Sequence, residues 1–496
     1  MNNNYLQINE KDNVVVAVKK LEKGNKIVFK DTEIEIRSEV PVGHKIAIKN
    51  IKTGENIIKY GEAIGRAVTD IESGEHVHTE NIKTNLKDII DYKYNKQIFE
   101  FDYKNKNIPT FKGYVREDGN VGTRNDIWIV PTVGCINQTA KNLSKMAKEK
   151  YGNKVDDIVA ITHDMGCSQL GDDLEITQKI LAGIIKNPNA AGVLVLSLGC
   201  ENNYLEIFKP FLGEFNKNRI KFLTIQNVKD EYLEAMNLLD ELVSYASEFK
   251  REDVGIDKLK IGFKCGGSDA FSGITANVLS GKVNDEIVSY GGSTVISEVP
   301  EMFGAEHLLM ARAKDKEVFN KIVNLINDYK NYFKKYNQQI YENPSPGNKK
   351  GGITTLEDKS LGCIQKGGSS QIVGVLDYGE QIDKPGFFLL NGSGNDQVST
   401  TNLVASGVNL IVFTTGRGNP FGNIVPTIKL SSNTELAKNK PHWIDFDAGQ
   451  LLNGINFKVL TQSFLDYIIK VASGELTNNE KNGFKSITIF KDGVIL

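Results

Sequence analysis

The first part of the chain alternates short apolar runs with turns and shows no long helical period. Between residues 13 and 82 the runs are NVVVAV, KIVF, EIEI, KIAIKNI, NIIKYG and HVHT, separated by Gly, Lys and acidic residues. Runs of this length bounded by turn residues are typical of β-strands. The pattern predicts a small all-β domain over residues 1–92.

A different pattern starts at Asp126, where near-continuous apolar runs alternate with segments of helical spacing. The runs are IWIVPTV, DIVAITH, GVLVLSLG, IKFLTIQ and LKIGFK, and the segments are QTAKNLSKMAKEKYG, LEITQKILAGIIK, YLEIFKPFLGEFNK and EYLEAMNLLDELVSYASEF. After the polar stretch YENPSPGNKKGG the theme returns with QIVGVLDYG, GFFLLNGSGND, LIVFTTGRG and TIKLSS, and ITIFKDGVIL predicts a final strand pair. Such alternation indicates parallel sheets covered by helices on both faces. We expect doubly wound, Rossmann-like α/β domains at 109–250 and 251–496.

Composition adds a domain count and excludes some partners. A chain of 496 residues is too long for one core, and residues 85–109, which lack Gly and are rich in Lys, Asn, Asp and Tyr, predict a linker at 93–108. With 60 Lys+Arg against 62 Asp+Glu, neither nucleic acid nor an anionic membrane is indicated. The polar N-terminus and the lack of a long apolar run predict a cytoplasmic protein, and five scattered cysteines predict reduced thiols.

Three of those cysteines occupy equivalent positions. Cys135 follows IWIVPTVG, Cys167 follows DIVAITH after three residues, and Cys200 closes GVLVLSLG. The carboxyl ends of strands in a doubly wound sheet face one crevice, so the thiols can converge and bind an iron–sulfur cluster with one open iron, or a soft metal. Cysteine is also a small residue that suits a buried strand-to-helix turn, and that alternative stays open.

Glycine-rich turns and histidines provide further candidate chemistry. The turns KCGGSDAFSGITAN, NGSGND and TTGRGNPFGN expose backbone N–H groups, amides and Arg417, a surface suited to a carboxylate that bears hydroxyls, unless they are plain tight turns. None matches a dinucleotide or phosphate-loop fingerprint, so no nucleotide cofactor is indicated. In SGEHVHTENI, His76 and His78 share one face of a strand, and His44 can join them on a metal. A surface pair of histidines is the simpler alternative.

Together these stretches resemble the altronate and galactarate dehydratases, a family of sugar-acid lyases. The resemblance covers nearly the whole chain: PVGHKIAIKNI, IIKYGEAIGRA and GEHVHTEN resemble an SAF domain, and GYVREDGNVGTRNDIWIVPTVGC, HDMGCSQ, LSLGCENN, KCGGSDAFSGITAN, GNKKGGITTLEDKSLG, GSGNDQVSTT and TTGRGNPFGNIVPTIK resemble the remainder. The ending SITIFKDGVIL is more similar to the altronate members. Sulfolactate sulfo-lyases are relatives in which we expect the SAF module on a separate chain. Glu80 stands where the family pattern allows a third histidine.

The resemblance implies removal of water from D-altronate to give 2-keto-3-deoxy-D-gluconate, with Fe²⁺, or alternatively Mn²⁺, as cofactor. It implies metal ligands at His44, His76 and His78, while Cys135, Cys167 and Cys200 stay the alternative cluster ligands that their placement at strand ends suggests. For substrate binding it points to Arg124, Ser268, Asn395, Asp396 and Arg417. It does not identify the catalytic base, for which His163, Asp269 and Lys264 are candidates because each is a residue type that can exchange protons. The alternatives are a galactarate dehydratase, a sulfolactate sulfo-lyase-like enzyme or a non-catalytic sugar-acid binding protein. A homo-oligomer is expected.

Overall fold

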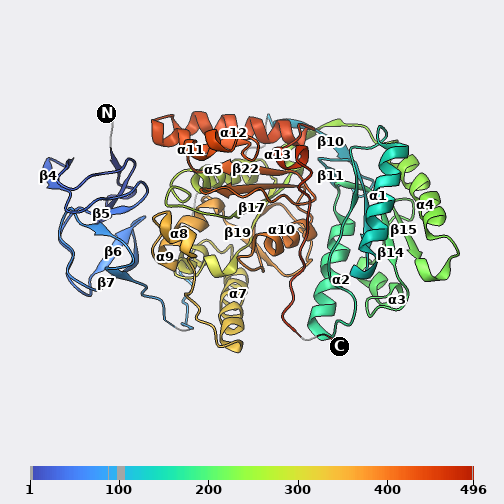
Figure 1. The fold of residues 1–496 in the computed structure, drawn as a ribbon, viewed down its shortest axis with the longest axis horizontal. Coiled ribbons are helices and arrows are strands. Elements are labelled where there is room, and N and C mark those ends of the chain that lie inside the picture. Colours follow the sequence, from blue (N-terminus) through green and yellow to red (C-terminus); the bar gives the residue numbers. More distant parts are fainter. Residues whose placement is uncertain (1–3, 88, 98–106, 494, 496) are drawn as a thin grey trace.

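The computed structural model describes residues 4–87, 89–97, 107–493 and 495. Figure 1 shows three parts along the long axis of the molecule. A β-rich N-terminal part lies at one end, a C-terminal α/β part lies in the middle, and the α/β part that carries α1, α4 and β14 lies at the other end. Within the described residues, no helix combines the length and the apolar character needed to cross a membrane.

The N-terminal part contains strands and no helix over residues 4–87, so the prediction of a small all-β domain is confirmed. Its main sheet has the antiparallel order β1-β2-β5-β8, beside a β3–β4 hairpin and a β6-β7-β9 sheet. Gly74, at φ 87°, is needed where chain segments meet, because a Cβ there would lie 1.9 Å from Glu35 O. The strands are β1 (Tyr5–Leu6), β2 (Val14–Ala17), β3 (Lys26–Phe29), β4 (Thr32–Glu35), β5 (Lys45–Ala47), β6 (Asn56–Lys59), β7 (Glu62–Ala67), β8 (His76–Val77) and β9 (Ile82–Lys83).

The predicted linker is described only in part. Residues 93–97 lie along the C-terminal domain, where Gln97 N donates to Ala311 O at 2.9 Å and Lys96 Nζ donates to Lys314 O at 2.8 Å. Residues 98–106 of the predicted linker lie outside the described residues. The described end of this segment is therefore anchored to the neighbouring domain.

The second domain is a four-stranded parallel sheet of order β13-β12-β14-β15. Ile127 and Ile129 pack toward α1 and α4, whereas Trp128 and Val130 pack toward α2, which explains why the strand is apolar throughout. The sheet is doubly wound, and its order reverses between β12 and β14. The elements are β12 (Asp126–Pro131), α1 (Asn137–Tyr151), β13 (Ile158–Ala160), α2 (Gly171–Lys186), β14 (Ala190–Ser197), α3 (Leu205–Phe208), β15 (Ile220–Thr224) and α4 (Glu231–Ala246).

The C-terminal domain has a seven-stranded parallel sheet of order β19-β20-β18-β17-β21-β22-β23. Its strands are β17 (Lys260–Cys265), β18 (Ser293–Ile296), β19 (Ile372–Leu376), β20 (Gly386–Leu390), β21 (Leu410–Thr415), β22 (Thr427–Ser431) and β23 (Phe446–Asp447). Its helices are α5 (Ala276–Ser289), α6 (Glu306–Met310), α7 (Lys316–Lys335), α8 (Pro346–Lys350), α9 (Leu356–Cys363), α10 (Asp396–Ala405), α11 (Thr434–Asn439), α12 (Phe457–Ala472) and α13 (Asn478–Lys481). The predicted fold class is confirmed. A small antiparallel sheet of β11 (Val121–Gly122), β10 (Thr110–Val115) and β16 (Glu252–Gly255) joins the two α/β domains.

Three local predictions differ from the structure. The segment after Tyr204 gives only α3 and a 3-10 turn at Lys209–Leu212, because Pro210 lacks an N–H donor and Gly213 turns the chain at φ 60°. The final strand pair is absent from the described residues: 486–493 belong to no strand, although Ile487 and Ile489 are buried between the α/β domains. Strand β18 was not predicted, since only four residues, STVI, stand between polar neighbours.

Candidate active site

The carboxyl ends of the seven-stranded sheet bring the predicted glycine-rich loops together. The loops after β17, β20 and β21 begin at the ends of those strands, and the sheet order reverses between β17 and β21. Ligands bind at such switch points in open parallel sheets. Here Lys264 Nζ lies 3.1 Å from Asp396 Oδ1 and donates to Gly394 O at 3.2 Å. Asp396 Oδ2 in turn accepts from Asn419 Nδ2 at 2.7 Å.

Three histidines of the N-terminal β domain meet where it contacts the C-terminal domain. The ring centroids of His44 and His78 are 4.8 Å apart, and those of His76 and His78 are 5.3 Å apart. His44 Nδ1 lies 2.9 Å from His76 Nε2. Two of the rings also touch the C-terminal domain, since His78 Nε2 is 2.9 Å from Lys349 O and His44 Nε2 is 3.3 Å from Lys350 O. The three predicted imidazoles therefore form one cluster, and it lies at a domain boundary.

A short segment around α8 connects the histidines to the loops. Asn348 Nδ2 donates to Ser268 O at 2.8 Å. A Cβ on Gly351 would lie 3.2 Å from Asp269 Cβ, and one on Gly347 would lie 3.7 Å from Arg417 Nε. The histidine cluster and the loops that carry Ser268, Asp269 and Arg417 thus flank the same five-residue helix.

The electrostatics of the histidine cluster suit metal binding. Burial lowers the pKa of both His44 and His76 to about 4, so both rings are neutral near pH 7. Neutral imidazole is the form that binds a metal ion. Glu80 is largely exposed, and its Oε2 lies 3.6 Å from His78 Nδ1, which leaves its carboxylate beside the cluster. The donor set of three imidazoles with an adjacent carboxylate fits a divalent metal such as iron or manganese.

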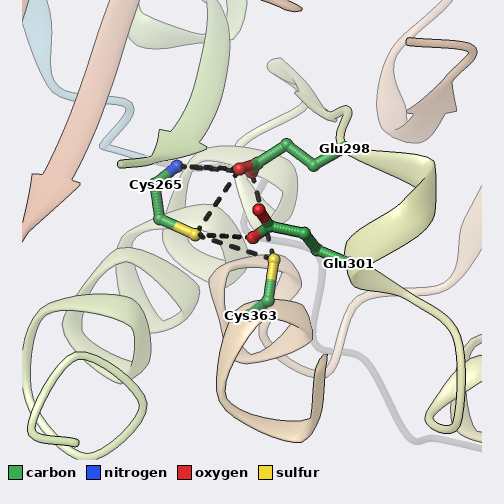
Figure 2. A group of neighbouring side chains, drawn as sticks. All are labelled: Cys265, Glu298, Glu301 and Cys363. Atoms are coloured by element: carbon green, nitrogen blue, oxygen red, sulfur yellow. Dashed lines mark hydrogen bonds between the residues drawn. The ribbon is translucent and has the colours of Figure 1, made fainter. Parts of the chain in front are cut away.

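A second group of candidate ligands lies buried beneath the loops. Figure 2 shows Cys265, Glu298, Glu301 and Cys363 converging from the end of β17, the turn after β18 and the end of α9. Their donor atoms all lie within 4.8 Å of one another, so the described residues contain a group that could hold a metal ion. The two Sγ atoms are 3.7 Å apart. Glu298 adopts φ 74°, a left-handed conformation that non-glycine residues adopt at a cost.

Lysine ammonium groups already balance the charge of this buried group. Lys366 Nζ lies 2.9 Å from both thiol sulfurs and 2.7 Å from Glu298 Oε2. Burial would lower the pKa of Lys366, but the facing thiols and Glu298 raise it well above its ordinary value. Burial would raise the pKa of Glu301, but Lys359 and Lys264 hold it at about 2. A metal ion among these ligands would require Lys366 to move.

Among the residues predicted for proton transfer, Lys264 and Asp269 lie at the site. Lys264 is fully buried and pairs with Glu298 as well as Asp396. Burial would lower its pKa, but these carboxylates raise it above its usual range, so it is a fixed cation. Burial raises the pKa of Asp269, whose Oδ1 accepts from Ser432 Oγ at 2.7 Å and whose Oδ2 accepts from Asn433 Nδ2 at 3.0 Å. Asp269 is the more suitable proton acceptor of the two.

The remaining predicted site residues divide between the site and other regions. Arg417 and Asn395 are exposed at the loops, although Asn395 Oδ1 also caps α10 by accepting from Val398 N at 3.1 Å. Arg124 does not lie with them: it forms a two-point ion pair with Glu480, at 2.7 and 3.0 Å, and donates to Val471 O. Its neighbour Thr123 bonds to Asn409 O, at the start of β21 and thus at the opposite end of the sheet.

His163 also lies elsewhere, in the second domain. Its Nε2 donates to Pro131 O at 2.7 Å, and its Nδ1 accepts from Met165 N at 3.1 Å, so both ring nitrogens have partners. Burial lowers its pKa. This arrangement makes His163 a neutral structural residue beside the predicted cysteine turns.

The sequence prediction did not identify Glu298, Glu301, Lys359 and Lys366. Both glutamates follow β18, which was not predicted, so their place at the carboxyl edge of the sheet was not evident. The detectable signal lies in SEVPE and in KSLGCIQK, where acidic, thiol and ammonium groups recur three or four residues apart and can share one face of a turn.

Comparison with known proteins places the chain in a family. Models of the SAF domain, the second domain and the C-terminal domain of D-galactarate/altronate dehydratases match residues 3–85, 113–247 and 256–495. An altronate dehydratase of Bacillus subtilis is 51% identical over 99% of both chains, and one of Escherichia coli is 45% identical over 99% of this chain and 100% of its own. A galactarate dehydratase of E. coli is 32% identical over 95% of this chain and 93% of its own. The fold and these matches together define the chain as a sugar-acid dehydratase. The chain belongs to the altronate/galactarate dehydratase family, which confirms the predicted resemblance.

The expected division of the sulfo-lyase relatives is also found. A (2R)-sulfolactate sulfo-lyase β subunit of Chromohalobacter salexigens is 32% identical over 77% of this chain, and an α subunit of Paracoccus pantotrophus is 48% identical over 11% of it. The parts that are fused in this chain thus match separate subunits there.

Proposed function

We propose that this protein is an altronate dehydratase, which removes water from D-altronate to give 2-keto-3-deoxy-D-gluconate. The relatives of that name share 51% and 45% identity with nearly the whole chain, whereas the galactarate dehydratase shares 32%. The observation that carries the proposal is the meeting of His44, His76 and His78 with the segment 347–352, which directly contacts the loop holding Ser268 and Asp269.

The reaction removes a proton from C2 and hydroxide from C3, and the enol then becomes the keto product. Held by the three histidines, Fe²⁺ (or Mn²⁺) would supply Lewis acidity to the substrate carboxylate and an adjacent hydroxyl. The exposed guanidinium of Arg417 can bind the carboxylate in two-point fashion. Ser432 and Asn433 position Asp269 to accept the C2 proton through hydrogen bonds to its Oδ1 and Oδ2, respectively. Oδ2 can take the proton because its partner, the Asn433 amide, is a neutral donor. The fixed charge of Lys264 holds Asp396 in place nearby.

The test is turnover of D-altronate by purified protein loaded anaerobically with ferrous iron, followed by the 2-keto acid formed. We expect His76→Ala to lose activity by at least a hundredfold and to bind less iron, because it removes a ligand. Asp269→Asn should lower kcat by about 10²–10⁴-fold while iron content stays normal. His307→Ala is the matched control, since His307 is half-exposed on α6 and pairs with Glu62 at 3.5 Å.

Three outcomes would contradict different parts of this proposal. Full activity of His76→Ala would contradict the metal assignment. Turnover of galactarate or sulfolactate in place of altronate would replace the proposed substrate. Tight binding of altronate without turnover of any of the three would indicate a sugar-acid binding protein.

A further inference from the structure

Three Gly-Cys pairs occupy the carboxyl ends of neighbouring strands in the second domain. Cys135 follows β12, Cys167 follows β13 and Cys200 follows β14, and all three side chains are exposed. Cys135 and Cys200 flank the point between β12 and β14 where the strand order reverses. This is the position at which open parallel sheets bind their ligands.

Two of the glycines hold the first two turns against one another. A Cβ on Gly134 would lie 2.8 Å from His163 O, and one on Gly166, at φ 98°, would lie 2.1 Å from Thr132 O. Gly134 N donates to Met165 O at 2.9 Å, which joins the first turn to the second. Glycine is therefore required at these positions because the backbones approach too closely for a side chain.

Two buried ionisable side chains brace the same turns. Glu201 accepts from Thr132 Oγ1 at 2.5 Å, from Ser197 Oγ at 2.7 Å and from Gly199 N at 2.7 Å, so its carboxylate joins the ends of β12 and β14. His163 joins the end of β12 to the second turn through Pro131 O and Met165 N. Glu201 and His163 are thus used to position the loops, whereas the three cysteine side chains are exposed.

The three thiols are neighbours, since the Cys135 thiol interacts with those of Cys167 and Cys200. Partial burial raises the pKa of the Cys135 thiol, and the nearby thiols of Cys167 and Cys200 raise it further. Helix α1 begins two residues after Cys135, and α2 begins four residues after Cys167.

We propose that Cys135, Cys167 and Cys200 bind an iron–sulfur cluster, with one iron left free of protein ligands. Thiolates are the usual ligands of such clusters, and a cluster that takes four protein ligands keeps one iron open when only three thiols are present. In Figure 1 the second domain and the histidine-bearing β domain lie at opposite ends of the long axis. The cluster is therefore a second site, separate from the one proposed for the histidines, and its existence does not depend on the proposed function.

The test is spectroscopic and uses the full-length protein. Protein purified without oxygen, or reconstituted with ferrous iron and sulfide, should contain acid-labile sulfide and show the brown absorbance and electron paramagnetic resonance signal of a cluster. The triple variant Cys135→Ser/Cys167→Ser/Cys200→Ser should lose all three, and each single variant should bind less iron. His76→Ala should retain the sulfide and the spectrum. Circular dichroism and the unfolding midpoint establish that each variant is folded.

The outcomes that would overturn the proposal are distinct. Wild-type protein that binds iron without sulfide, or a triple variant that keeps the spectrum, would remove the cluster from these cysteines. A disulfide between two of them after anaerobic purification would do the same. A cluster that is present while altronate turnover is lost only in His76→Ala supports two independent sites. If the altronate proposal fails, the spectra still decide the cluster proposal.

Discussion

At the scale of single residues, the ammonium group of Lys366 is the centre of the buried Cys–Glu group. It contacts both thiols and Glu298 and is fully buried. We predict that Lys366→Met lowers the free energy of unfolding by about 3–5 kcal/mol, because it leaves the buried Glu298 with one fewer partner. The urea midpoint measures this. Lys321→Met is the control, since the exposed pair of Lys321 with Glu317 should be worth less than about 0.5 kcal/mol. Equal midpoints for the two variants would contradict the prediction.

The residue scale also shows what sequence patterns could and could not predict. Residue type and spacing predicted that His44, His76 and His78 would gather, and their rings are about 5 Å apart. The same reasoning named Lys264 and His163 as proton-transfer candidates, but type alone does not show partners. In the fold one is held by two carboxylates and the other by two backbone groups. Roles that depend on the environment of a side chain therefore required the structure.

At the scale of elements, apolar periodicity predicted the longer strands and helices well. The parallel strands β12, β14, β17 and β21 are buried on both faces, and this is why their sequences are nearly continuous apolar runs. Short elements carry less signal: β18 has only four residues, and the glutamates that follow it were missed together with it. Elements whose position depends on tertiary packing, such as the C-terminal segment around Ile487, gave a false strand prediction.

The turn between β13 and α2 allows a prediction at this scale. Gly166→Ala should lower stability by about 2–5 kcal/mol, because it adds both a left-handed alanine and a Cβ 2.1 Å from Thr132 O. Gly171→Ala is matched to it: φ is 52°, and nothing lies within 4 Å of the new Cβ. Only the backbone cost of about 1–2 kcal/mol is expected there. Urea midpoints of the two variants test the difference, and equal values would mean that the strand ends can separate without cost.

At the scale of the whole molecule, a buried charge group fixes the β domain to the C-terminal domain. Asp358 of α9 accepts from Lys45 and Lys59 of the β domain, each at 2.9 Å, and all three side chains are buried. Lys45 is adjacent to His44 and also donates to Gly352 O at 2.8 Å. The same contact that joins the domains therefore positions the histidine cluster over segment 347–352. Assembly of the proposed active site depends on this domain contact.

Removing the carboxylate should separate these parts. We predict that Asp358→Asn destabilises the domain contact by about 3–5 kcal/mol, since it leaves two buried ammonium groups without a counter-charge. Calorimetry should then show the β domain melting before the remainder, with altronate turnover lost in parallel. Asp70→Asn, which removes the exposed partner of Lys52, should change neither. A single unshifted transition in Asp358→Asn would show that apolar packing alone holds the domains together.

Acid should have the same effect as the substitution. Burial would raise the pKa of Asp358, but Lys45 and Lys59 hold it well below its ordinary range. A carboxyl group whose pKa is lower in the folded than in the unfolded state stabilises the fold above the unfolded pKa, and this contribution is lost as the pH falls through the folded value. The wild-type contact should therefore weaken below about pH 4, whereas in Asp358→Asn the early transition should already be present at pH 7 and depend less on acid. Calorimetry between pH 7 and pH 3 measures both, and an identical acid dependence in the two proteins would assign the acid sensitivity to other carboxylates.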